Sequence, residues 1–76
     1  MIEIENQGNI RTIILNRPEK LNAINLEMAT SIRKEVEKAS EEECVKILII
    51  TGNGRAFSVG GDVNEMGNYL PKAGDI

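Results

Sequence analysis

The sequence VKILIITGNG, residues 45–54, is the most informative stretch of this chain for its architecture. Its first seven residues are mostly β-branched and apolar, which is typical of a β-strand, and Gly52 and Gly54 end that strand abruptly. A helical pattern precedes the strand, and a β-α-β connection of this length favours parallel pairing. Because nearly every side chain is apolar, we expect an α/β fold in which a strand over residues 45–51 is buried on both faces.

The residues before this strand predict a hairpin followed by a helix. Residues 2–5 alternate apolar and polar side chains, Gly8 marks a turn, and residues 10–15 supply the return strand. After a polar loop, Asn25 is a favourable N-cap for a helix that we expect over residues 26–42. The apolar side chains that recur there at helical spacing are Ala29, Ile32, Val36 and Ala39.

Length and composition limit the chain to one small domain. We expect residues 1–76 to form that domain, with no second one. One Phe, one Tyr and no Trp leave aliphatic side chains and Met to form the core. A domain of this size buries only about 60–65% of the surface that its unfolded chain exposes, so the core is small for a chain that must fold alone.

Charge and residue usage argue against several classes of protein. The net charge is −3, and the nine basic residues are scattered, which argues against nucleic acid as a partner. No apolar run is long enough to span a bilayer, and the acidic, alternating N-terminus is unlike a secretory signal, so we expect a cytoplasmic protein without membrane contact. The absence of histidine, with Cys44 as the single cysteine, argues against a metal site and a His-based triad.

The glycine-rich loop after the strand is the candidate site. It fails the dinucleotide fingerprint because Phe57 stands at the third glycine position, and no P-loop motif occurs in the chain. Gly60 and Gly61 precede Asp62, which could cap a short helix from Val63 to about residue 66. A backbone N–H there could stabilise negative charge on a carbonyl, as half of an oxyanion hole. The simpler alternative is a loop-to-helix turn with an Asp cap.

Two stretches resemble the signatures of the crotonase superfamily, the enoyl-CoA hydratase/isomerase family. They are LNRPEKLNAIN (residues 15–25) and LIITGNGRAFSVGGDVNEM (residues 48–66), and their order, spacing and intervening helix also agree. The resemblance implies that residues 1–76 are a partial crotonase-like domain, the N-terminal part of a spiral of β-β-α units: hairpin, helix, buried strand and short helix. Hydratases, isomerases, dehalogenases, hydrolases and ring-forming synthases share both signatures, so the resemblance does not select one reaction.

The resemblance also implies roles for single residues. Those that it implies for the coenzyme A pocket are Lys20, Leu21 and Ala23. Those that it implies for the acyl-thioester end are Ser58, Gly60, Gly61, Asp62 and Val63. Gly61 matches the first backbone oxyanion donor, and Asp62 is then a structural cap rather than a proton-transfer acid. Val59 departs from the pattern, because a small residue such as Ala is usual at that position.

Two functions follow as hypotheses. In the first, the chain is the N-terminal part of an acyl-CoA-binding enoyl-CoA hydratase or isomerase, a lyase or isomerase of fatty acid metabolism that forms trimers or hexamers. Coenzyme A is then part of the substrate and no cofactor is needed. The family's second oxyanion donor and catalytic carboxylates match nothing in this chain, so we expect the chain alone to be inactive. In the second, the chain is an autonomous, non-catalytic module that binds a partner or completes another subunit.

Overall fold

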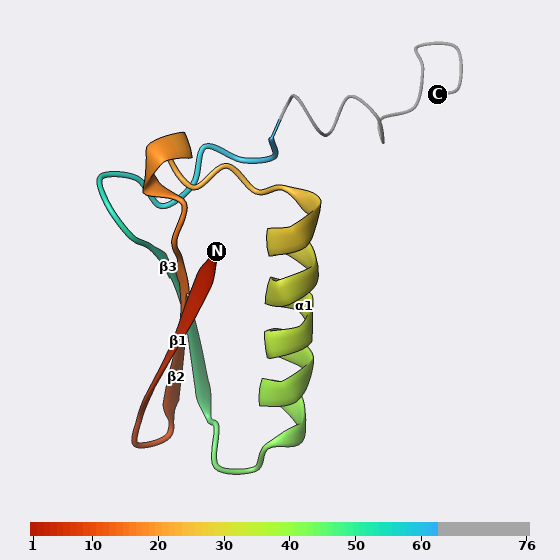
Figure 1. The fold of residues 1–76 in the computed structure, drawn as a ribbon. Coiled ribbons are helices and arrows are strands. Elements are labelled where there is room, and N and C mark those ends of the chain that lie inside the picture. The colour runs from red at the N-terminus through yellow and green to blue at the C-terminus, as the bar shows by residue number, and fades with distance from the viewer. Residues whose placement is uncertain (63–76) are drawn as a thin grey trace.

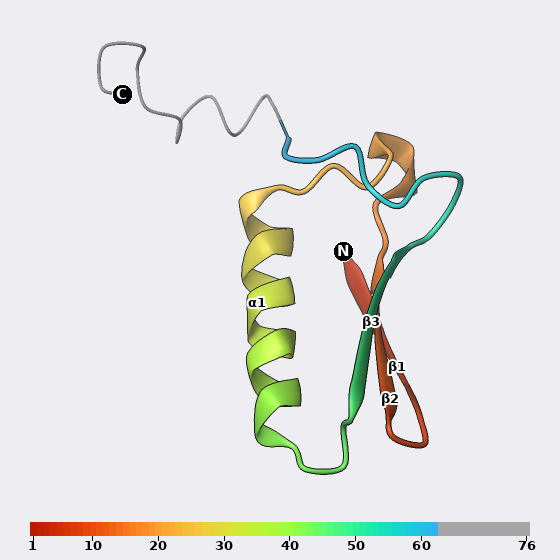
Figure 2. The same cartoon turned by 180° about the vertical axis from the view of Figure 1, so that it is seen from behind.

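The structure, a computed structural model, describes residues 1–62. Its elements are β1 (Ile2–Gln7), β2 (Ile10–Leu15), the 3-10 turn η1 (Pro18–Lys20), α1 (Leu26–Glu41) and β3 (Ile47–Gly52). The predicted order of hairpin, helix and strand is confirmed. The helix ends one residue earlier than expected and the last strand begins two residues later. The helix lies against one face of the sheet, so the fold has two layers (Figures 1 and 2).

The sheet has three strands in the order β1-β2-β3. β1 and β2 are antiparallel, joined by a turn in which Gly8 has φ 61°, a conformation that glycine adopts without strain. β2 and β3 are parallel, with Ile13 opposite Ile50 and Leu15 opposite Gly52. The parallel pairing predicted from the β-α-β connection is therefore confirmed. Because the two strands are parallel, the C-terminal ends of β2 and β3 lie at the same end of the sheet.

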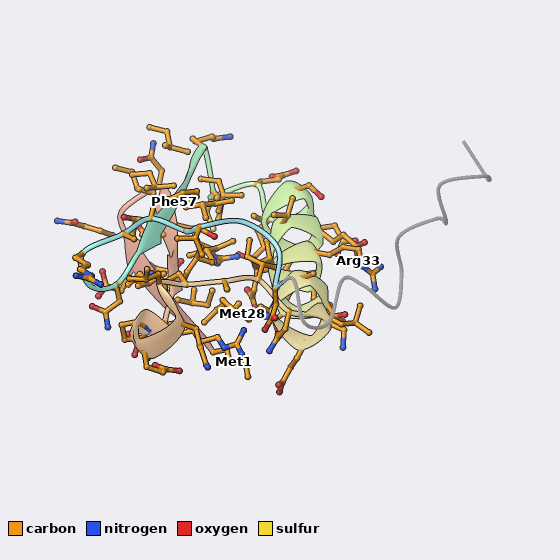
Figure 3. All side chains as sticks on the ribbon, turned by 90° about the horizontal axis from the view of Figure 1, so that it is seen from above. Met1, Met28, Arg33 and Phe57 are labelled. Carbon is orange, nitrogen blue, oxygen red and sulfur yellow. The ribbon has the colours of Figure 1, made fainter. Side chains whose placement is uncertain are left out.

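The core lies between α1 and β2. Alternate residues of β2 are buried, which places Ile13 and Leu15 beneath the helix. Met28 is fully buried and points into the space between helix and sheet, whereas Arg33 lies on the outer side of the helix (Figure 3). The predicted apolar stripe is therefore shifted: Met28 is buried, and Ala29 is exposed because the helix turns that position away from the sheet.

The prediction of a strand buried on both faces is wrong. β3 lies at the edge of the sheet, and the exposed fractions of Ile47, Ile49 and Ile50 are 49%, 43% and 40%. The helix covers one face only, and within residues 1–62 no segment pairs with the outer edge of β3. The apolar composition showed that the strand could be buried, but burial also depends on neighbours that the described residues do not supply.

Both ends of α1 are held by polar contacts. At the N-terminus, the side-chain oxygen of Asn25 accepts a hydrogen bond of 2.9 Å from the backbone N–H of Met28, so the predicted N-cap is confirmed. At the C-terminus, Arg11 on β2 donates to Glu42 at 2.5 Å. This hydrogen bond, together with the positive charges of Arg11 and Lys38, lowers the pKa of Glu42 below its ordinary value, against the opposing effect of desolvation.

The predicted short helix that begins at Val63 lies outside the described residues. Within residues 1–62, no helix combines the length and apolar character needed to cross a bilayer.

Candidate functional site: two paired loops

Two loops that are far apart in the sequence run side by side near the N-terminal end of α1 (Figures 1 and 2). Three backbone hydrogen bonds join them: Val59 N–H to Leu21 O at 3.1 Å, Ile24 N–H to Gly60 O at 2.8 Å, and Asp62 N–H to Ile24 O at 2.9 Å. We call residues 20–24 and 58–62 the paired loops.

Most of the predicted site residues lie on the paired loops. Those brought together are Leu21, Ala23, Ser58, Gly60, Gly61 and Asp62. Lys20 is exposed at the last position of η1, at the start of the first loop. Val63 lies outside the described residues, so its predicted role stays a prediction.

The backbone N–H of Gly61 points away from the first of the paired loops, residues 20–24. It forms an isolated parallel bridge with Ile24, in which the bonds are made by Gly60 O and Asp62 N–H on either side of it. Because successive peptide groups of extended backbone point to opposite sides, the N–H of Gly61 faces away from Ile24. Gly61 is exposed, and within residues 1–62 its N–H donates no hydrogen bond. It is therefore a fixed donor that faces outward.

Ser58 holds the second loop in shape. Its hydroxyl donates to the backbone oxygen of Asn22 at 2.8 Å and accepts from the N–H of Gly60 at 3.0 Å. Gly60 has φ 101°, which a residue with a side chain rarely adopts. The N–H of Gly60 is thus already engaged, whereas the adjacent N–H of Gly61 has no acceptor within residues 1–62.

Asn22 is fully buried and connects three segments. Its amide nitrogen donates to the backbone oxygens of Asn53 and Ala56 at 2.9 and 3.0 Å, and its side-chain oxygen accepts from the N–H of Arg17 at 2.8 Å. Its φ of 56° lies in the left-handed region, which Asn tolerates better than most residues. Asn22 therefore fixes the first loop to the segment that follows β3.

Arg17 and Asp62 form an ion pair across the paired loops. Nη1 of Arg17 lies 3.0 Å from Oδ2 of Asp62 and also donates to the backbone oxygen of Ala23 at 3.0 Å. Each of the two side chains is only 15% exposed. This ion pair was not predicted for Asp62, and the helix that Asp62 is predicted to cap lies outside the described residues.

Close packing of the backbone explains why position 52, the first glycine of the glycine-rich loop, has no side chain. A Cβ at Gly52 would lie only 2.7 Å from the Cα of Phe57, closer than real Cβ atoms approach, so the backbone there tolerates no side chain. Gly54 has φ 93° and lies against Pro18. These two glycines therefore shape the return of the chain toward the first loop.

Arg17 and Asn22 both organise the site, although neither is among the residues predicted for it. Asn22 lies in a short polar stretch where many conformations were possible, and no local pattern predicts that it is buried. A polar side chain that can adopt positive φ was the only available signal. Among residues 1–62, no cluster of His, Cys, Asp or Glu side chains could hold a metal ion.

Solved structures share this architecture. The enoyl-CoA hydratase from Thermoplasma volcanium GSS1 is 42% identical with a TM-score of 0.79, over 97% of this chain and 29% of that one. An enoyl-CoA hydratase/isomerase from Mycobacterium paratuberculosis is 44% identical with a TM-score of 0.78, over 82% of this chain and 24% of that one. The chain thus has the fold of the N-terminal portion of crotonase-type proteins.

The family follows from the sequence match. The profile of the family described as Enoyl-CoA hydratase/isomerase matches residues 10–74, and the chain belongs to this family.

Two curated relatives with different names match the chain equally well. The trans-2-decenoyl-[acyl-carrier-protein] isomerase of Streptococcus mutans is 44% identical over 59 residues, which are 78% of this chain and 22% of that protein. The small ribosomal subunit protein mS47 of Schizosaccharomyces pombe is also 44% identical over 59 residues, 78% of this chain and 14% of that protein. Since the chain spans less than a quarter of either relative, similarity in this region identifies the family and not the activity.

Proposed function

We propose that the paired loops bind the thioester end of an acyl-CoA substrate, as the N-terminal part of an enoyl-CoA hydratase or isomerase. The observation that carries this proposal is the outward N–H of Gly61, fixed by the bonds of Gly60 and Asp62 to Ile24. Family membership supports it, because solved structures named enoyl-CoA hydratase share this fold.

The chemistry asked of Gly61 is the stabilisation of an oxyanion. Its N–H would donate to the thioester oxygen, which gains negative charge as an enolate forms. A donor whose position is set before the substrate arrives needs no reorganisation at the moment of reaction. The hydrogen bonds around Gly61 provide that fixed position, and the missing Cβ lets an oxygen approach the backbone closely.

The first loop would bind the coenzyme A portion. The segment that contains Lys20, Leu21 and Ala23 runs from beside the Gly61 N–H to the exposed end of η1. At that end the ammonium group of Lys20 could meet a phosphate. Coenzyme A would enter as part of the substrate and not as a resident cofactor. The other groups needed for turnover, a second oxyanion donor and acid–base carboxylates, match nothing in residues 1–76.

Backbone NMR tests this proposal on the chain itself. Crotonyl-CoA should shift the amide signals of Gly61 and of the first loop, whereas coenzyme A alone should shift the first loop and leave Gly61 nearly unchanged. A Gly61→Ala variant keeps the N–H and adds a Cβ, so it should weaken the effect of crotonyl-CoA more than that of coenzyme A. Shifts confined to residues outside the paired loops would contradict the assignment.

A second candidate function is a non-catalytic module within a larger assembly. It is favoured by the relative named as a ribosomal protein, which is as similar to this chain as the named isomerase is. The same titration separates the two candidates, because a module without a substrate site should show no response to crotonyl-CoA at the paired loops.

A further inference from the structure

Gly61 lies in the second loop between two side-chain contacts. On one side of it, the hydroxyl of Ser58 donates to the backbone oxygen of Asn22 at 2.8 Å. On the other side, the carboxylate of Asp62 accepts from Nη1 of Arg17 at 3.0 Å. Both contacts reach back to the segment that precedes α1, so the second loop is held to that segment on both sides of Gly61.

One nitrogen of Arg17 bonds to both of the paired loops. Nη1 donates to the backbone oxygen of Ala23 in the first loop and to Oδ2 of Asp62 in the second, each at 3.0 Å. The side chains of Arg17 and Asp62 are largely buried, so solvent screens their attraction less than it would at the surface. The guanidinium group is planar and holds its donors in a rigid fork, and hydrogen bonds between charged groups are about twice as strong as neutral ones. The Arg17 side chain therefore fixes the second loop to the first at Asp62.

The first loop has a separate anchor. The side-chain oxygen of Asn22 accepts from the backbone N–H of Arg17, a bond that every substitution at position 17 except proline would keep. The amide nitrogen of Asn22 also donates to the backbone oxygens of Asn53 and Ala56. Loss of the Arg17 side chain should therefore leave the first loop in place and release the second loop at Asp62.

We propose that Arg17 is a positioning residue, which acts through Asp62 to keep the N–H of Gly61 aimed at the thioester oxygen of an acyl-CoA; this role rests on the function proposed above. Gly60 and Gly61 lack a Cβ and have wide conformational freedom, so the direction of this N–H depends on the residues that hold the loop. A donor stabilises an oxyanion best when its position is set before the charge develops. The charge of Arg17 also neutralises the Asp62 carboxylate, which would otherwise repel a negative oxygen bound at the adjacent residue.

The test compares the affinities of two ligands for variants of the 76-residue chain by NMR titration. Arg17→Met should raise the dissociation constant of crotonyl-CoA about three- to tenfold, as for the loss of one hydrogen bond, and that of coenzyme A by less than about twofold. Arg17→Lys keeps the charge without the fork, so it should recover part of the loss. Arg33→Met removes an exposed ion pair with Glu37 on α1; it is the matched control and should change neither constant.

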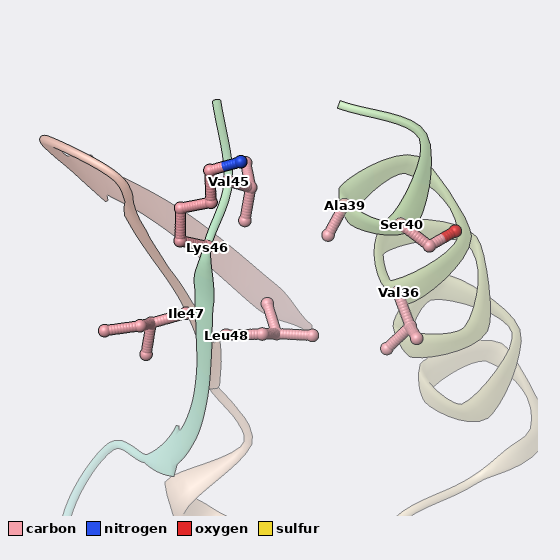
Figure 4. Close-up of a pocket in the computed structure, with 7 residues that line it drawn as sticks. All are labelled: Val36, Ala39, Ser40, Val45, Lys46, Ile47 and Leu48. Atoms are coloured by element: carbon pink, nitrogen blue, oxygen red, sulfur yellow. The ribbon is translucent and has the colours of Figure 1, made fainter. Parts of the chain in front are cut away.

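Amide hydrogen exchange without ligand separates this role from a general loss of stability. In Arg17→Met, the N–H groups of Ile24 and Asp62, which bond the paired loops together, should exchange faster than in the wild-type chain. The N–H of Val36 is the reference, because Val36 lies in the C-terminal half of α1 and faces Leu48 across a groove (Figure 4). Its exchange rate should stay nearly unchanged.

A double variant, Arg17→Met with Asp62→Asn, leaves no unpaired carboxylate and gives the same measurements if Arg17→Met alone does not fold. Equal weakening of both ligands, no weakening of crotonyl-CoA, or exchange at Ile24 that rises no more than at Val36 would each overturn the role of Arg17. No response of Gly61 to crotonyl-CoA in the wild-type chain would instead overturn the proposed function, and the role of Arg17 with it.

Discussion

Asn22 makes three side-chain hydrogen bonds from a fully buried position, so its replacement should be costly. We expect Asn22→Ala to lower the free energy of unfolding by about 2–4 kcal/mol, since buried backbone groups lose partners worth about 1 kcal/mol each. The positive φ at position 22 adds strain of roughly 1 kcal/mol in the variant, because Ala has a Cβ but lacks the polar side chain that helps Asn to adopt this conformation. Urea unfolding followed by circular dichroism measures the change.

Two further variants separate these contributions. Asn22→Gly removes the hydrogen bonds but tolerates positive φ, so it should be slightly less destabilising than Asn22→Ala. Asn9→Ala, at an exposed turn position with no side-chain hydrogen bond among the described residues, should change stability by less than about 0.5 kcal/mol. A stable Asn22→Ala protein would contradict the structural role of this residue.

Glu42 makes stability depend on pH. Its pKa is lowered in the folded protein by the hydrogen bond from Arg11, so its contribution is present above the ordinary value of 4.5 and is lost as pH falls through the folded pKa. We expect Glu42→Gln to lower the melting temperature near neutral pH and to have a shrinking effect below about pH 4.5. Glu41→Gln, one residue earlier in the chain and exposed, is the control and should leave the melting temperature near neutral pH almost unchanged. An equal effect of Glu42→Gln at pH 3 and pH 7 would contradict the interpretation.

Gly61 can be tested in a working enzyme. We suggest a chimaera in which residues 1–62 replace the matching segment of the hydratase from Thermoplasma volcanium. Gly61→Pro deletes the N–H, and turnover should fall about 10²- to 10³-fold, as for the loss of one oxyanion donor. Lys20→Ala removes one exposed charge and should change the apparent affinity by less than about fivefold. Unchanged turnover by a correctly folded Gly61→Pro chimaera would exclude the assigned role.

At the scale of elements, the side chain of Asn25 caps the N-terminus of α1. Asn25 accepts from the N–H of Met28, so Asn25→Ala should cost about 1 kcal/mol of stability. Asn25→Asp keeps an acceptor at the cap and adds a negative charge at the positive end of the helix dipole, so it should be close to neutral. Chemical denaturation of the two variants at one protein concentration measures both effects. Equal losses in both variants would show that the cap does not stabilise the helix.

The elements also differ in how well short-range patterns predicted them. Three signals involve only residues that are close together in the chain: the alternation in β1, the N-cap at Asn25 and the β-branched run in β3. The elements that they predicted are present. Ala29 and Met28 show the limit of this approach. Both fit an amphipathic helix, and only the docking of α1 on β2 selects Met28 for the core.

For the whole molecule, we expect residues 1–76 to show no hydratase turnover on crotonyl-CoA. At the paired loops the Gly61 N–H faces outward, and the carboxylate there, Asp62, is paired with Arg17. A donor in contact with bulk water loses most of its catalytic advantage, because a low-dielectric site is what strengthens it. The loss of enoyl-thioester absorbance measures activity, with Gly61→Pro as the control for contaminating enzyme. Turnover that is abolished in that control would contradict the expectation.

The amino-acid sequence was sufficient for the class of fold, the order of elements, the parallel pairing and the family, because strand and helix periodicity, caps, turns and two long motifs are local properties. Three features required the tertiary structure. The edge position of β3 depends on which strands are present beside it and not on its own composition. The burial of Asn22 depends on acceptors 31 and 34 residues away along the chain. The direction of the Gly61 N–H follows from a bridge to Ile24 that only the folded backbone can make, since long-range hydrogen bonds are set by the packing of whole segments and leave no periodic trace in the sequence.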